Sequence, residues 1–380
     1  MTIGTTRFVG ARLREAREAR GVSAASLADM LDITRAAISQ YECGQTSPSP
    51  DVMERITRIL DLPARFFLTP VFSEGEHSTI FYRSMHAATK AARVRAERRY
   101  DWLRRIVLWL SAYVQLQRVN FPQINVPDDI RRISDGDIEE IAAQARKHWR
   151  LDNGPLLSAV GLLEHAGAIV VRMELNAETL DAFSEWHPED QRPYLVLGSD
   201  KASAVRSRYD ACHELGHMLL HRLVPSEALR NTATFRLVED QAHRFAGSFL
   251  LPEASFSDDL ALVTIDTFLS LKSKWQVSVA AMLKRATDLN LVAPDHARKL
   301  WMNLTRRGWR RREPLDERLE AEEPRFIRNT FDLLIEQHIV TPLQLEAHLG
   351  LRTRDIEQVC GLAPGYLDQG PHAIRLPQRA

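Results

Sequence analysis

Cysteine is scarce in this chain of 380 residues. Cys43, Cys212 and Cys360 lie far apart, and three thiols cannot all pair. A small domain held together by disulfides is therefore excluded, and reduced thiols in the cytoplasm are expected. No apolar run approaches the roughly 18 residues that span a membrane, and Met1–Gly10 has no apolar signal-peptide core. These absences predict a cytoplasmic protein without a membrane partner.

Net charge is absent too, because 50 Lys and Arg residues balance 50 Asp and Glu residues. A field of the whole protein that concentrates nucleic acid is excluded, so any nucleic-acid site has to be a local patch. Hydrophobic residues make up 44% of the chain and charged residues 26%, which is typical of a folded protein. The length fits two to three domains of about 100–200 residues each.

Helical periodicity dominates the chain, and the fold class is mainly α with an α+β part. Strands are predicted over 168–175 and 194–197, and the two helices that follow them over 208–223 and 235–250. We predict four parts: an all-α domain over 1–69, a basic helical connector over 70–125, an α+β domain with a small sheet over 126–314, and a helical C-terminal region with a loose tail over 315–380.

The connector is predicted to contain one or two long helices over 81–117, and a proline-containing linker follows over 120–129. Its outer face is rich in arginine, with eight basic residues against Glu97 and Asp101 between Arg83 and Arg105. Such a face either adds phosphate contacts or is simply solvated, and we favour the solvated face.

The strongest chemical signal is the sequence His213-Glu214-Leu215-Gly216-His217 on a predicted helix. Four residues turn a helix by about 400°, so both imidazoles lie on one face and can bind one zinc ion. Glu214 then lies where it can take a proton from the water at the zinc. Two ordinary histidines, or a metal site kept for sensing or stability, are the alternatives.

A catalytic zinc site needs a third protein ligand and an open position. His221 lies about 6 Å further along the same helix and is too far to share the ion. Glu239, Asp240 and His243 lie on the next helix. We favour Glu239, because the small Ala242 permits close helix contact and His243, four residues on, can support the ligand from behind.

The segments RSRYDACHELGHMLLH (206–221) and EDQAHRFAGSFLLP (239–252) resemble the ImmA/IrrE metallopeptidases, and the resemblance extends over 138–314. It implies a gluzincin-like α+β domain with zinc bound by His213, His217 and Glu239, and Glu214 as the base. It also implies a cytoplasmic endopeptidase that cleaves a partner repressor or antitoxin. His243 stands where this family usually has Asn or Asp.

Peptide hydrolysis also needs a hydrogen-bond donor for the oxyanion. Tyr209, His221 and Tyr194 are candidates between which the sequence does not decide. The strand over 194–197 is either an edge that binds an extended substrate or, as we favour, an ordinary strand of the sheet. Cys212 is expected to be a small buried residue.

The N-terminal segment from Ser23 to Gly44 predicts two helices joined by a short turn. Leu27, Ala28, Leu31, Ile33 and Ile38 supply the core between them. The second helix of such a pair enters the major groove of DNA. The residues expected on its outer face and first turn are Thr34, Arg35, Ala36, Ser39 and Gln40.

This unit resembles the DNA-binding domains of the XRE or Cro/CI family over about sixty residues, and it departs from them at Ala24, where that family usually has Gln. Nine arginines against eight acidic residues over 7–65 predict modest affinity for DNA. Dimerisation would raise that affinity by joining half-sites. A helical protein-interaction module is the alternative.

Together the two resemblances predict a DNA-binding regulator that contacts an operator and carries a zinc endopeptidase. The rival is a non-catalytic transcription factor or antitoxin whose metallopeptidase-like domain binds a partner or ligand. The intact Glu214 argues against this rival, since metal binding alone requires no base.

Overall fold

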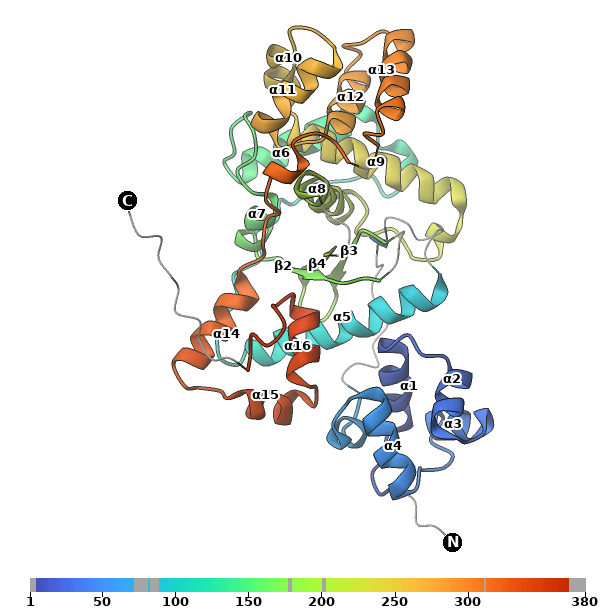
Figure 1. Ribbon diagram of the computed structural model, residues 1–380. Coiled ribbons are helices and arrows are strands. Elements are labelled where there is room, and N and C mark those ends of the chain that lie inside the picture. Colours follow the sequence, from blue (N-terminus) through green and yellow to red (C-terminus); the bar gives the residue numbers. More distant parts are fainter. Residues whose placement is uncertain are drawn as a thin grey trace.

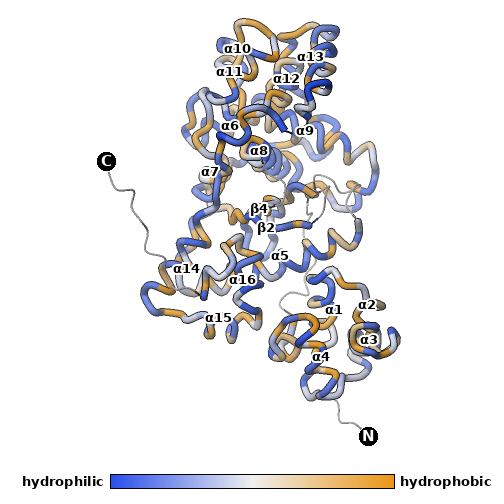
Figure 2. Tube along the Cα trace, viewed as in Figure 1, coloured by the Kyte–Doolittle hydropathy of each residue, from blue (hydrophilic) through white to orange (hydrophobic). Residues whose placement is uncertain are grey.

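The computed structural model describes residues 5–71, 81–82, 89–176, 180–199, 203–310 and 312–368. It confirms a mainly helical chain with a small sheet (Figure 1). Arg83 and the predicted loose tail after Gly370 lie outside the described residues. No described helix is long and apolar enough to cross a membrane, and Figure 2 shows polar residues interrupting the apolar ones along the helices.

The N-terminal unit is a compact set of short helices. These are α1 (Gly10–Ala19), α2 (Ala24–Leu31), α3 (Arg35–Glu42), α4 (Pro50–Leu60) and the 3-10 helix η1 (Ala64–Leu68). The side chains of Ser23 and Thr34 cap α2 and α3 by accepting hydrogen bonds from backbone N–H groups of the first turns, at 3.0 and 3.2 Å. Four of the five predicted core residues are buried and Ile33 is partly buried, which confirms the expected helix pair.

Helix α5 (Lys90–Leu110) is shorter than the predicted helix over 81–117. Residues 83–88 lie outside the described residues, but the prediction is wrong at both ends, since residues 81–82 form a strand and the helix stops at Leu110. Residues 111–113 are exposed, so a further turn would bury no apolar surface. Since tertiary burial supplies most of a helix's stability, the helix ends there. The chain then runs without regular structure to η2 (Ile130–Arg132).

The sheet has the strand order β1-β3-β4-β2. Its strands are β1 (Phe81–Tyr82), β2 (Ile169–Met173), β3 (Ala182–His187) and β4 (Arg192–Gly198). β2 and β4 match the predicted strands, whereas β1 and β3 were not predicted. β4 lies between β3, to which it is antiparallel, and β2, to which it is parallel. The segment over 194–197 is thus an interior strand, as favoured, and the edge beside β3 is paired with β1.

The two faces of the sheet serve different cores. Along β2, β3 and β4, successive side chains point to opposite faces. Val170 and Leu195 pack in the cluster that contains α8 (Ala204–Leu220). Val171 and Val196 pack in the cluster that contains α5 and the N-terminal unit. The sheet therefore separates α8 on one side from α5 on the other, as Figure 1 shows.

Further helices cover α8 and the C-terminal side of α5 (Figure 1). Those beside and above α8 are α6 (Asp135–His148), α7 (Ala159–His165), η3 (Ala228–Arg230), α9 (Thr232–Leu250), α10 (Glu253–Asp259), α11 (Ile265–Trp275), α12 (Val279–Asp288) and α13 (Pro294–Arg306). After η4 (Asp316–Arg318), the helices near α5 are α14 (Phe326–Glu336), α15 (Pro342–Leu349) and α16 (Thr353–Cys360).

The arginines of α5 do not form the solvated face that we favoured. Arg98 pairs with Glu18 of the N-terminal unit at 2.8 Å, and Arg104 pairs with Glu189 of the β3–β4 turn at 2.9 Å. Arg95 donates to the backbone carbonyl of Leu175. These long side chains bury their stems and satisfy polar groups of neighbouring elements. These three arginines therefore bind other parts of the protein and are not a free basic surface.

Trp102 joins the N-terminal unit to α5. Its side chain is 1% exposed, its Nε1 donates to Glu15 Oε1 at 2.8 Å, and its ring meets the Phe66 ring edge-on at 5.8 Å. Glu15 also accepts from Arg12. The contact therefore combines a large buried aromatic surface with a satisfied buried carboxylate.

We expect Trp102→Ala to lower the free energy of unfolding by about 3–5 kcal/mol, the usual cost of removing a buried Trp. The N-terminal unit should also become sensitive to limited proteolysis, because its docking surface is lost. Thermal denaturation and proteolysis of the full chain measure both effects. Trp301→Ala, at a partly buried position on α13, is the control and should cost less. Equal losses in the two variants would contradict the docking role.

Candidate metal centre and DNA-binding face

Close packing of α8 on α9 builds the metal centre. A Cβ atom at Gly216 would lie 3.1 Å from the Phe245 ring and 3.3 Å from the backbone of Ala242. Ala242 is fully buried at this crossing. A larger residue at either position would push the helices apart, so the small pair sets how near the side chains of α9 approach the histidines of α8.

Three side chains converge where the helices cross. The Nε2 atoms of His213 and His217 lie 3.0 Å apart, and the Glu239 carboxylate oxygens lie 3.5 and 3.3 Å from them. Ligands of a tetrahedral zinc ion with bonds of about 2.0–2.1 Å are about 3.3 Å apart. Both histidines are fully buried, and the Glu239 side chain is 12% exposed. The three donor atoms therefore fit one zinc ion.

A chain of hydrogen bonds fixes the tautomer of His217. The Gln241 Nε2 donates to the Ile130 carbonyl at 2.8 Å, so its Oε1 faces His221 Nε2 at 3.0 Å and accepts a hydrogen bond from it. Burial lowers the pKa of His221 to about 3, so the ring is neutral and its Nδ1 is an acceptor. That Nδ1 lies 3.0 Å from His217 Nδ1, which must donate. The Nε2 lone pair of His217 is then directed at the candidate ion.

Glu214 lies beside the three donors without being needed among them. It is fully buried, and Ser184 of β3 donates to its Oε2 at 2.6 Å. A carboxylate oxygen of Glu214 lies within 4.8 Å of the ligand atoms of His213 and His217. The hydrogen bond from Ser184 orients the carboxylate toward the centre. The neighbouring Cys212 is buried in the apolar cluster, as expected, and burial raises the pKa of its thiol.

Asp240 and His243, also on α9, lie at different distances from the candidate metal centre. Asp240 is exposed and is not among the grouped donors of the described residues, whereas His243 is half-buried and groups with His213 and Glu239. The His243 ring centroid lies 4.4 Å from that of His213 and is stacked on Tyr209 at 5.9 Å. His243 therefore stands at the margin of the centre, and Asp240 points away from it.

The other oxyanion candidates are directed elsewhere. The Tyr209 hydroxyl donates to the His243 carbonyl at 3.0 Å, and both ring nitrogens of His221 have partners within the helices. Tyr194 packs on the α5 face of the sheet, opposite to α8, and its hydroxyl donates to Asp190. The proposal of Tyr194 as an oxyanion donor is therefore wrong, because its place in β4 turns the ring to the other side.

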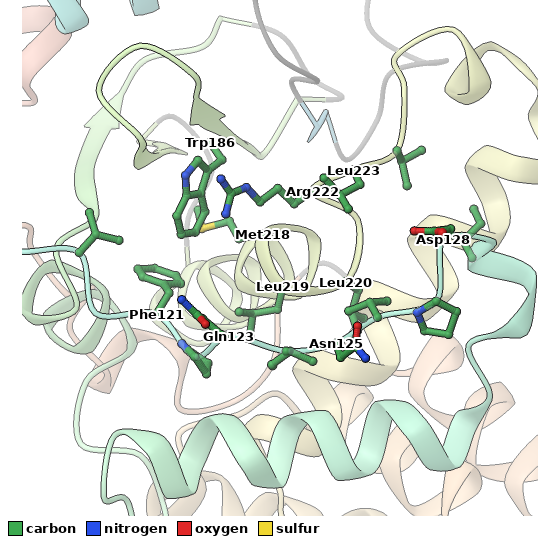
Figure 3. Close-up of a pocket in the computed structure, with 17 residues that line it drawn as sticks. Phe121, Gln123, Asn125, Asp128, Trp186, Met218, Leu219, Leu220, Arg222 and Leu223 are labelled. Atoms are coloured by element: carbon green, nitrogen blue, oxygen red, sulfur yellow. The ribbon is translucent and has the colours of Figure 1, made fainter.

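A pocket lined mostly by apolar side chains lies between α8, the end of β3 and the chain over 119–130 (Figure 3). Met218 follows Glu214 by one helical turn, and Trp186 follows Ser184 by two residues, so both lie on the sides of α8 and β3 that meet at Glu214. The pocket has a volume of about 530 Å³ and is closed on the other side by residues 121–128. The Arg222 guanidinium stacks on Trp186 at 4.1 Å from the ring centroid.

The outer face of α3 is open. Thr34, Arg35, Ala36, Ser39 and Gln40 are all exposed, whereas Ile38 between them is fully buried. α5 instead contacts α1, on another side of the unit (Figure 1). The five predicted DNA contacts therefore share one accessible surface.

Two known families match these two parts. Residues 13–67 match the family described as Helix-turn-helix, and residues 163–287 match the IrrE N-terminal-like domain of the M78 peptidases. The chain joins a helix-turn-helix domain to an IrrE-like domain. The second match covers β2, β3, β4, α8 and α9, which are the elements that hold the candidate metal centre.

Two curated relatives match over short stretches. One, named "Putative HTH-type transcriptional regulatory protein" of Pyrococcus furiosus, is 44% identical over 57 residues, which is 15% of this chain and 18% of the relative. Another of the same description, from Methanocaldococcus jannaschii, is 43% identical over 54 residues, which is 14% and 17%. The chain thus matches less than a fifth of the length of these relatives.

Sequence reasoning missed two residues of the site. Gln241 lies in the segment that carries Glu239, but its role depends on the carbonyl of Ile130, which is distant in sequence. Ser184 lies in a strand that was not predicted, and only the pairing of β3 brings it to Glu214. The segment AFSEWH over 182–187 does not alternate apolar and polar residues, so the usual signal of a strand is missing there.

We expect the purified protein to bind about one equivalent of zinc, as a site with three protein ligands does. His213→Ala, His217→Ala and Glu239→Ala should each lose the metal, because each removes one of the three protein ligands. Metal content after gel filtration, read by mass spectrometry, is the measurement. Asp240→Ala is the matched control and should keep the zinc. Loss of zinc in Asp240→Ala or His243→Ala, with full zinc in Glu239→Ala, would show that Glu239 is not the third ligand.

Gln241→Ala should bind zinc more weakly by about 10–100-fold, the usual cost of losing a group that orients a metal-bound histidine. Competition with a zinc-binding dye gives the affinity. Unchanged affinity, with the fold intact, would show that the hydrogen-bond chain does not orient His217.

Proposed function

We propose that the protein is a cytoplasmic DNA-binding transcriptional regulator whose IrrE-like domain is a zinc-dependent endopeptidase that cleaves a specific protein partner, such as a repressor or an antitoxin. The observation that carries this proposal is the buried Glu214, held by Ser184 beside the triangle of His213, His217 and Glu239. A site that only stored metal would need no second, separately oriented carboxylate.

His213, His217 and Glu239 would hold the zinc ion, which would supply Lewis-acid polarisation of a peptide carbonyl and acidify a water molecule. Glu214 takes the proton from the attacking water and delivers it to the leaving amine. Ser184 keeps its carboxylate in place through these transfers. His243, at the margin of the centre, is the remaining candidate for a donor to the oxyanion.

A substrate of this centre would be an extended peptide with a large apolar side chain. β1 pairs antiparallel with Phe183 and Ser184 at the edge of β3, so a substrate strand would take the place of β1 there. Peptides bind such edges through main-chain hydrogen bonds, and pockets for side chains give specificity. The pocket formed by Met218 and Trp186 lies beside this path and is lined by apolar groups (Figure 3).

The helix-turn-helix domain would position the protein on an operator. Arg35 can bond guanine and Gln40 can bond adenine in the major groove. The exposed face of α3 carries only one positive charge, so phosphate contacts from a single domain are few. A second copy bound to an adjacent half-site would supply the missing affinity.

We expect Glu214→Gln to keep zinc and thermal stability and to lose peptidase activity by about 10²–10⁴-fold, because the general base is removed while the ligands remain. Wild type and variant are incubated with candidate repressors and antitoxins, with zinc or with chelator, and the fragments are identified by mass spectrometry. Glu227→Gln, at an exposed glutamate, is the matched control and should cleave as the wild type does.

Wild-type activity in Glu214→Gln would overturn the assigned base. If the zinc-loaded wild type cleaves no candidate but binds one of them tightly, the non-catalytic reading is correct, and the IrrE-like domain is a partner-binding module.

We expect Arg35→Ala and Gln40→Ala to weaken binding to the preferred operator by about 1–3 kcal/mol each, the usual value of a bidentate base contact, with little effect on random DNA. Both side chains are exposed, so the fold should persist. Fluorescence anisotropy with a fragment of the protein's own promoter, at two salt concentrations, is the measurement, and Arg298→Ala on the distant α13 is the control. A folded domain that binds no genomic fragment better than random DNA would be a protein-interaction module instead.

A further inference from the structure

A polar cavity lies where three distant parts of the chain meet, away from the metal centre. Its volume is about 390 Å³, within the usual range for small-molecule sites. The N-terminal unit contributes Arg20 and Asp61, α5 contributes Arg95 and Arg99, and α16 contributes Arg354, Asp355 and Gln358. Glu174 and Asn176, after β2, complete the polar lining.

One of the four arginines is already neutralised. Arg20 binds Asp355 through both terminal nitrogens, at 2.5 and 2.9 Å, and its Nε donates to the Leu60 carbonyl. In this bidentate pair, both carboxylate oxygens of Asp355 and both terminal nitrogens of Arg20 already have hydrogen-bond partners. Arg20 and Asp355 therefore hold the N-terminal unit against α16 and contribute no net charge to the cavity.

The two α5 arginines that line the cavity, Arg95 and Arg99, bind neutral groups instead. Arg95 donates to the carbonyls of Leu175 and Asn176, and Arg99 donates to the carbonyl of Glu174 and to Gln358. The Nε atoms of both are buried without a hydrogen-bond partner among the described residues. Burial lowers the pKa of Arg99, and so do the charges of Arg95 and Arg20. Two like charges one turn apart repel each other.

Arg354 adds a third uncompensated cation. It is exposed at the start of α16 and makes no hydrogen bond or ion pair within the described part of the chain. The remaining acids of the lining, Asp61 and Glu174, are exposed to solvent. Water screens such exposed carboxylates, so they compensate the buried guanidiniums only weakly.

We propose that this cavity binds a small polyanion through Arg95, Arg99 and Arg354. The ligand carries oxyanion groups, phosphate or carboxylate, that the planar guanidinium forks match. The guanidiniums of Arg95 and Arg99 are already fixed by backbone carbonyls, so little side-chain entropy is lost on binding. Such a ligand touches α5 and α16 directly beside the Arg20–Asp355 pair, and hence lies at the joint that holds the DNA-binding domain.

Isothermal titration calorimetry of the full chain at constant ionic strength tests this proposal. Pyrophosphate is the probe in one arm and citrate in the other, which separates phosphate from carboxylate ligands. One saturable site is expected for at least one probe. Arg354→Gln and Arg99→Gln should each weaken binding about tenfold, since each removes a charged hydrogen-bond donor. Arg298→Gln, at an exposed arginine of α13, should bind as the wild type does.

Arg99→Gln also removes two structural hydrogen bonds, whereas Arg354→Gln removes none, so the second variant keeps the test valid if the first unfolds. The proposal is overturned if neither probe binds at millimolar concentration, or if Arg354→Gln binds as tightly as the wild type. It is equally overturned if Arg35→Gln, on the face of α3, is the variant that removes binding.

Discussion

The sheet carries apolar side chains on both of its faces, and this alternation holds the two functional parts in one body. Residues such as Val170 and Leu195 pack under α8, where the histidines lie, while Val171 and Val196 pack over α5 and toward the N-terminal unit. A shift of one residue in the pairing of β4 would exchange the two sets. It would also move Ser184 away from Glu214, because β3 is placed by its pairing with β4. The register of three short strands therefore decides both where Ser184 meets Glu214 and how α5 packs on the sheet.

The crossing of α8 and α9 depends on a second, steric constraint. Gly216 lies between the two histidines in sequence and meets Ala242, which lies between Glu239 and Phe245. In both segments, the candidate metal ligands thus stand beside the small residues that permit close approach of the helices. This arrangement explains why the short sequence 213–217 predicted so much of the centre. The spacing of the histidines, the small contact residue and the base follow from helical geometry alone.

What could not be predicted depends on contacts between distant segments. Glu239 was already favoured from the sequence, whereas the role of Gln241 depends on the Ile130 carbonyl, which is distant in sequence. The helix pair α2 and α3 was predicted well, because Ser23 and Thr34 cap the two helices locally and the pair is stabilised by its own core. The arginine face of α5 was wrongly predicted to be solvated, because its partners are distant in sequence. A charge run looks the same in sequence whether water or the carbonyls of another element satisfy it.

The buried arginines of α5 connect the DNA-binding domain with the sheet that carries the candidate metal centre on its other face. The arginines of α5 hold Glu18 of the N-terminal unit, Glu189 of the β3–β4 turn and the carbonyls after β2, so one helix touches the DNA-binding domain and the sheet behind the metal centre. The face of α3 points away from α5, and the metal centre lies on the far side of the sheet (Figure 1). DNA and a protein substrate would therefore not compete for the same surface. Communication between them can pass through α5, or through α16, which the Arg20–Asp355 pair ties to the N-terminal unit and which packs on β2.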